Sequence, residues 1–151
     1  MNIRVLVLPF ALAAALGTMV APAGAQQTPA APSLYKQLGG YDAIAAVSAD
    51  FIKRLASNPK LSRFFVGLND EHKALVQQRV VEFICFKTGG PCIYTGRDMK
   101  TAHAGLRITE DDWNAAIADF KATEAQFNIP PDLRAQLEAF LTQLKPDIVT
   151  G

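Results

Sequence analysis

Along most of the chain after residue 40, apolar side chains recur at intervals of three or four residues, and glycines or prolines separate the successive runs. This spacing places the apolar side chains of each run on one face of an α-helix. We find no alternating strand pattern of convincing length and no internal repeat. The pattern therefore predicts an all-α fold, with apolar helix faces along residues 41–56, 75–86, 113–127 and 131–144.

The ends of the predicted helices carry their own signals. Residues 89–91 (Gly-Gly-Pro) follow the second helix and are typical of a helix stop. Thr109, with Asp112 three residues later, resembles a capping box at the start of the third helix. Residues 92–106 contain two glycines and have mixed polarity, which predicts a loop with only a short helical turn at residues 99–104.

The amino-terminal segment has the pattern of a secretory signal. Arg4 provides a positive end, residues 5–20 are almost wholly apolar, and residues 23–25 (Ala-Gly-Ala) suit signal peptidase. A membrane anchor is the alternative, but the apolar run is short and contains a proline and a glycine. We therefore expect residues 1–25 to be removed and the protein to be exported, with the periplasm as its compartment and no stable membrane anchor after cleavage.

The rest of the chain is expected to hold a flexible leader over residues 26–32, rich in Gln, Ala and Pro, and one domain over residues 33–151. Loss of Arg4 with the signal lowers the formal charge from +1 to zero. No basic stripe remains to suggest a nucleic-acid partner. Cys85 and Cys92 stay in the mature chain, and an oxidising compartment favours a disulfide between them. Their spacing does not match common zinc motifs.

The chain contains only two histidines, His72 and His103, so imidazole chemistry has few candidates. His103 lies in the loop-flanked segment before Gly105, where its ring can reach out of the helical layer. From spacing alone, both a metal ligand and a capping or surface residue fit this position. The residues around His103 decide between these interpretations.

Several of those residues form a recognisable series. It comprises Leu34-Tyr35, Leu38-Gly39-Gly40, Phe51, Phe64-Phe65, Gly89-Gly90-Pro91 and, above all, residues 94–106 (YTGRDMKTAHAGL). In their order and spacing these residues resemble the truncated (two-over-two) haemoglobins of group 1, from about Ser33 to the end of the chain. The resemblance implies haem b (iron protoporphyrin IX) between two antiparallel helix pairs.

The resemblance also implies roles for particular residues. His103 corresponds to the proximal ligand of the haem iron, Met99 packs on the proximal face, and Phe65 is the aromatic that wedges the macrocycle. Tyr94 would reach a haem propionate. The remaining lining positions that the resemblance implies are Phe51, Ile84, Ile108 and Trp113. A neutral imidazole is a good iron ligand, and an apolar pocket excludes water that speeds oxidation of ferrous iron.

The distal side departs from the family pattern. Group 1 members usually carry a tyrosine after the phenylalanine of the second helix, whereas this chain has Ile52. Positions where the family often has glutamine fall on Val76 and Val80. If the helix is turned by about one residue, roughly 100°, Gln77 enters the pocket instead. His72 is a second candidate for a polar distal residue, although its place near the start of the helix favours a structural role.

The resemblance implies reversible binding of oxygen, carbon monoxide or nitric oxide, in a carrier or scavenger of the exported compartment. The alternative is a haem redox enzyme that acts on nitric oxide or peroxide. It would need an external electron donor, because the sequence shows no reductase domain or nicotinamide motif. Covalent c-type haem attachment needs a Cys-x-x-Cys-His motif, which Cys85 and Cys92 do not form. The sequence leaves the oligomeric state open.

Overall fold

The computed structural model describes residues 31–151, so the expected signal peptide and all but the last two residues of the expected leader lie outside it. The described chain is all-helical, without a strand, as predicted. Its elements are α1 (Leu34–Gln37), α2 (Gly40–Ser57), the 3₁₀ helix η1 (Ser62–Phe65), α3 (Asp70–Lys87), α4 (Met99–His103), α5 (Glu110–Gln126) and α6 (Pro131–Ile148). Within these residues, no helix has the length and apolar character needed to cross a membrane.

The structure corrects one predicted boundary, because α3 begins at Asp70 and not at Leu75. The Asn69 side chain accepts a hydrogen bond from the backbone N–H of His72 at 2.8 Å. Acidic side chains at residues 70 and 71 further favour a helix start there, because they face the positive end of the helix dipole. This first turn is polar, so apolar periodicity could not detect it.

The predicted capping box at the start of α5 is confirmed. Thr109 and Asp112 bond each other's backbone N–H groups, at 3.2 Å and 3.0 Å. The bond from the Thr109 backbone N–H, helped by Arg63, lowers the pKa of the Asp112 carboxyl. The loop before α5 contains α4, where a short helical turn was expected.

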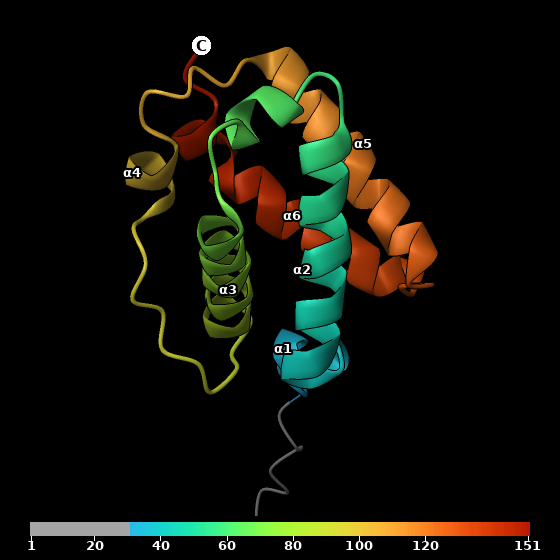
Figure 1. Cartoon of the computed structure of the whole chain (residues 1–151). Helices are drawn as coiled ribbons and strands as arrows, with labels where there is room; N and C mark the ends of the chain where they lie inside the picture. The colour runs from blue at the N-terminus through green and yellow to red at the C-terminus, as the bar shows by residue number, and fades with distance from the viewer. Residues whose placement is uncertain (1–30) are drawn as a thin grey trace, which may run out of the picture. The chain divides into compact units, whose positions relative to one another are not determined.

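The four long helices form two pairs, as the resemblance implied. Helices α2 and α3 pack against each other and run in opposite directions (Figure 1). Helices α5 and α6 form the second layer, in which α5 packs against α2 and α6 packs against α4. The buried core joins the two layers, because Phe120, Ile129 and Leu137 pack together and Phe51 meets Phe120 edge-on at 5.3 Å.

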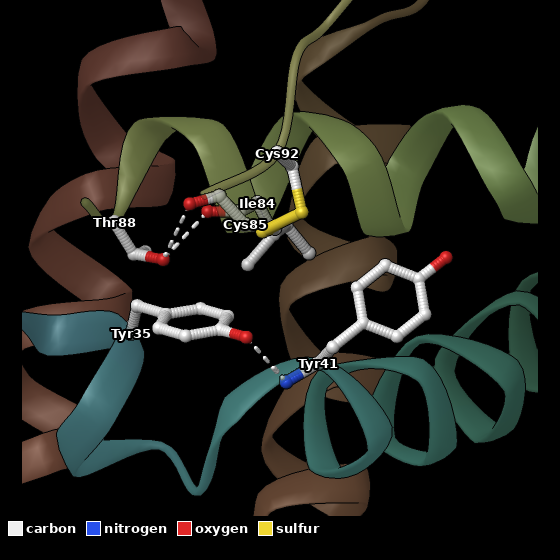
Figure 2. Close-up of a disulfide and its surroundings, with 6 residues drawn as sticks. All are labelled: Tyr35, Tyr41, Ile84, Cys85, Thr88 and Cys92. Atoms are coloured by element: carbon white, nitrogen blue, oxygen red, sulfur yellow. Dashed lines mark hydrogen bonds between the residues drawn. A yellow bond between two sulfur atoms is a disulfide. The ribbon is translucent and has the colours of Figure 1, made fainter. Parts of the chain in front are cut away.

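The expected disulfide is present and closes the carboxyl end of α3. Cys85 and Cys92 have a Cα–Cα distance of 5.8 Å, and Cys85 is fully buried. Figure 2 shows the Tyr35 ring beside this bond, with its hydroxyl accepting from the backbone N–H of Tyr41 at 3.1 Å. A Cβ atom on Gly90 would lie 2.5 Å from the Tyr35 ring, so only glycine allows this approach. The short helix α1 is thereby held against the disulfide loop.

Candidate functional site

His103 is the last residue of α4, and its ring is held by its own helix. The ring Nδ1 lies 2.8 Å from the backbone carbonyl oxygen of Met99, one turn earlier. Because a carbonyl oxygen can only accept, Nδ1 carries the proton and donates it. In this tautomer of the neutral ring, the lone pair of Nε2 is left for another group. His103 is half-buried.

Helix α4 is short, and its start is fixed by Asp98. The Asp98 carboxylate accepts from the backbone N–H of Thr101 at 2.7 Å and from the Thr101 hydroxyl at 3.0 Å. The backbone bond is the main reason that the pKa of Asp98 is lowered. The cap keeps α4 wound, and a wound turn is needed to bring the Met99 carbonyl to the His103 ring.

A cavity of about 340 Å³ lies between α2, η1 and the first half of α3. Its lining includes four predicted site residues, Ile52, Phe65, Val76 and Gln77. Gln77 is half-buried and is the uncharged hydrogen-bond donor of the lining. The other lining residues, which the sequence analysis missed, are Ala49, Lys53, Ala56, Asp70, Lys73 and Ala74.

The structure does not bring all the predicted distal residues to this cavity. Val80 is half-buried but is absent from the lining. His72 is exposed in the first turn of α3, where its backbone N–H is capped by Asn69. Phe51 packs on the core phenylalanine Phe120. Of the predicted pair Val76 and Val80, only the first therefore lines the cavity, and it does so with Gln77.

Ile84 faces a second cavity of about 230 Å³ between α2, α5 and α6. Its walls are mostly apolar, with Ile44, Phe120 and Leu137 among them. Ser48 also lines it, and the buried Ser48 Oγ has no hydrogen-bond partner within residues 31–151. Ile84 lies about two turns after Gln77 on the same face of α3, further along the contact with α2.

The remaining predicted residues lie in α4, in the loops that flank it and at the start of α5. Met99 and Trp113 are half-buried, and Ile108 is buried. The Tyr94 hydroxyl donates to the backbone carbonyl of Arg97 at 2.5 Å. Burial raises the pKa of this hydroxyl. Tyr94 therefore stabilises the loop before α4 in this structure.

A polar bridge connects α3 to the same loop. The Arg79 guanidinium donates to the Thr95 hydroxyl and to the Glu82 carboxylate, each at 2.7 Å. Hydrogen bonds from Gln78 and Arg79 lower the pKa of Glu82. Together with the disulfide, the bridge fixes the loop at two points between α3 and α4.

These features fit the haem implied by the sequence. In Figure 1, α3 lies between α2 and α4, and the cavity, whose walls include α3 itself, is on the α2 side of α3, whereas His103 is on α4. The Nε2 lone pair of His103 is the donor type that haem iron takes. Large apolar side chains on these elements, including Phe65, Val80, Met99 and Trp113, are only half-buried within the described protein. A flat apolar group would bury the rest of their surface.

Comparison with known proteins gives matches over the whole domain. A family model described as bacterial-like globin matches residues 33–149. The chain is 29% identical to the group 1 truncated hemoglobin GlbN of Mycolicibacterium paratuberculosis over 119 residues, which are 79% of this chain and 85% of that protein. It is 34% identical to the GlbN of Nostoc commune over 85 residues, which are 55% of this chain and 68% of that protein.

Solved structures show the same arrangement of helices. The ferric truncated hemoglobin of Tetrahymena pyriformis superposes with a TM-score of 0.72 at 21% identity, over 80% of this chain and 100% of that one. The 2/2 hemoglobin of Synechococcus sp. PCC 7002, with covalently attached heme, gives a TM-score of 0.71 at 24% identity. That match covers 78% of this chain and 98% of the other. At these identities the likeness concerns the fold.

Proposed function

The chain belongs to the bacterial-like globin family, and on that premise we propose that it holds haem b through His103 and binds diatomic gases reversibly. Haem-based gas binding follows from the family. The identity of the ligating residue, the haem type and the role as carrier or scavenger are the parts that we propose.

One observation carries the assignment of His103. The Nδ1–H bond to the Met99 carbonyl fixes the tautomer in which Nε2 is unprotonated, and it fixes the orientation of the ring. His72, the other histidine, is exposed in the first turn of α3. Haem supplies the iron that binds the gas, and this chain supplies the imidazole, the apolar walls and a donor near the ligand side.

The cavity that we assign to the ligand side is lined by Ile52, Phe65, Val76 and Gln77, together with small residues and the charged residues Lys53, Asp70 and Lys73. Ile52, Phe65 and Val76 form its apolar wall. The Gln77 amide can donate a hydrogen bond, and a hydrogen bond to a partly charged group contributes roughly 1.5–3 kcal/mol. Gln77 then takes the part that a distal tyrosine would play, with Ile52 at the tyrosine position. This arrangement supports retention of oxygen together with reversible release.

We assign the activity to the exported compartment, the periplasm. The signal-like residues 1–25 and the Cys85–Cys92 disulfide support this assignment, since disulfides persist in oxidising compartments. Cell fractionation with sequencing of the mature amino terminus tests it. A cytoplasmic protein that keeps residues 1–25 would contradict the assignment.

The absorption spectrum of purified variants tests the iron ligand. His103→Ala is expected to lose most of its haem or to release it readily, because no other imidazole lies on α4. His72→Ala is the matched control and is expected to keep the haem content and the Soret band of the unmodified protein. Normal haem content and an unchanged Soret band in His103→Ala would refute the assignment. A change from six to five coordination in His72→Ala would make His72 a ligand.

A further inference from the structure

The segment around His103 carries an excess of positive charge in a domain whose formal net charge is zero. Arg4 is the only charged residue before Lys36, so residues 31–151 contain equal numbers of acidic and basic side chains. Residues 87–107 nevertheless contain a single acid, Asp98. The exposed basic residues of this segment are Lys87, Arg97, Lys100 and Arg107.

These basic side chains are not neutralised by ion pairs. None of the ion pairs found within residues 31–151 includes any of them, whereas Arg54, Arg63 and Lys121 elsewhere are all paired with acids. The carboxylate of Asp98 is bound to Thr101 as the cap of α4. The segment therefore projects a positive field into solvent.

Contacts within the segment connect the basic residues. The Lys87 ammonium lies 5.8 Å from the centre of the Phe83 ring, which meets the Tyr94 ring edge-on at 5.2 Å. The Tyr94 hydroxyl bonds the carbonyl of Arg97, which precedes α4. Lys100 is in the first turn of α4, and Arg107 follows Leu106, whose N–H bonds the His103 carbonyl.

Apolar side chains are exposed in the same segment. Ile93 is 79% exposed and Leu106 is 39% exposed. Exposed apolar groups with charges around them are typical of protein–protein contact sites. A small contact of this kind, guided by charge, suits a transient complex in which the partner binds and leaves quickly.

We propose that this surface, defined by Lys87, Arg97, Lys100 and Arg107 and called the basic surface below, docks an acidic electron-donor protein. The inference rests on the proposed function, because a gas-binding haem must be ferrous and oxidises with time. One electron passes from the reduced centre of the donor to the ferric iron. The donor is oxidised by one electron and the iron is reduced by one, with no bond made or broken and no proton moved.

The position of His103 explains why the partner is an electron donor. His103 is half-buried on a helix of five residues, and its neighbours Ala102 and Ala104 are exposed. Of the basic surface, Lys100 lies on α4 with His103, and Arg97 and Arg107 lie in the loops that flank α4. Electron transfer slows steeply with distance, so a donor works best where little protein separates it from the haem.

The test measures binding and reduction with a plant-type [2Fe–2S] ferredoxin, an acidic one-electron donor. Titration calorimetry of oxidised ferredoxin onto the ferric holoprotein gives the affinity, and stopped-flow mixing with reduced ferredoxin gives the second-order rate. The variant is Arg97→Glu with Lys100→Glu. Its matched control is Lys36→Glu with Lys60→Glu, which changes the net charge equally at exposed residues away from α4.

At low ionic strength, the Arg97→Glu/Lys100→Glu variant is expected to bind ferredoxin about tenfold more weakly and to be reduced about tenfold more slowly. The control pair is expected to change both by less than about twofold. The differences in binding and in reduction rate should both disappear at about 0.5 M salt, because salt then screens the attraction between the charged surfaces almost completely. Ile93→Ser is expected to weaken binding at every salt concentration.

Equal effects of the two charge variants, or no effect of either, would overturn the docking surface. Binding of the holoprotein to anionic phosphatidylglycerol vesicles but not to ferredoxin would also overturn it. Haem content is measured first, because a purified chain without a Soret band contradicts the proposed function. Normal haem content with unchanged ferredoxin binding contradicts the docking surface alone.

Discussion

At the scale of single residues, the site depends on which side chain of α3 faces the ligand. Gln77 lines the cavity with Ile52, whereas the next residue, Gln78, is exposed and bonds Glu82 at 2.8 Å. The two glutamines are adjacent in sequence, and they differ in the direction in which their side chains point. They therefore form a natural pair of test and control.

We expect Gln77→Leu to speed the release of oxygen by on the order of tenfold, because the hydrogen bond to bound oxygen is lost. Gln78→Leu should leave the release rate within about twofold, because its amide lies outside the cavity. Stopped-flow displacement of oxygen by carbon monoxide measures both rates. Equal rates in the two variants would mean that position 77 does not meet the ligand.

Glu124 is a second residue whose environment is unusual. It is 1% exposed, and its Oε1 has no hydrogen-bond partner among the described residues. Burial, followed by the negative charge of Glu138, raises the pKa of this carboxyl. The folded state therefore binds the proton more tightly than the unfolded state. For this group, the free energy of unfolding falls as the pH rises through the folded pKa.

Glu124→Gln should consequently be more stable than the unmodified protein at high pH, by on the order of 1 kcal/mol at pH 8. The difference should shrink towards zero near pH 4, where the unmodified carboxyl is protonated in both states. Urea unfolding of both proteins across this range provides the measurement. The exposed Glu71→Gln serves as the control, and a pH-independent gain in Glu124→Gln would argue against a buried charge.

At the scale of elements, apolar periodicity predicted the four long helices, and helix stops and caps predicted most of their ends. Apolar periodicity did not detect the first turn of α3, which is polar and depends on the Asn69 cap. It also did not detect α1, which is too short to show a period. The sequence did not decide whether the Gln77 side chain faces the cavity or solvent. That direction depends on the rotation of α3 about its axis, which is set by packing against α2. Such packing is a contact between residues that are distant in sequence, so local patterns do not predict it.

The disulfide is the element-scale feature with the clearest energetic effect. Replacing both Cys85 and Cys92 with alanine should lower the free energy of unfolding by about 2 kcal/mol, because the closed loop is short. Urea unfolding measures this loss. A phosphine reductant should destabilise the unmodified protein by a similar amount and leave the double variant unchanged. No loss in the double variant would mean that the bond does not stabilise the fold.

Carbon monoxide affinity before and after reduction separates two roles for the same bond. A structural staple leaves the affinity unchanged, whereas a redox switch alters it. The bond joins the last turn of α3 to the loop that leads to α4. The Arg79 bridge to Thr95 holds that loop independently, so we expect the affinity to stay the same.

At the scale of the whole molecule, the apolar interior is incomplete without a partner group. The buried core cluster consists of Phe120, Ile129 and Leu137, while the large apolar residues Phe65, Val80, Met99 and Trp113 are only half-buried. A ligand that binds the folded state alone adds to its stability through mass action. The fold and the haem should therefore be strongly coupled.

Haem loading should raise the melting temperature of the apoprotein by at least about 10 °C, since tight binding adds roughly 4 kcal/mol or more. The increase should be much smaller in His103→Ala and unchanged in His72→Ala. Thermal unfolding followed by circular dichroism, with and without one equivalent of hemin, measures it. A similar increase in all three proteins would indicate that apolar contact alone holds the haem.

The carbonyl partner of His103 also has an electronic consequence. A carboxylate that accepts from Nδ1 draws the proton away and makes the opposite nitrogen a stronger donor of electron density. Strong donation from the protein ligand favours cleavage of an O–O bond. The Met99 carbonyl is uncharged and draws the proton less, so the Nε2 of this chain is a moderate donor. Such a ligand suits holding a gas molecule intact and letting it go.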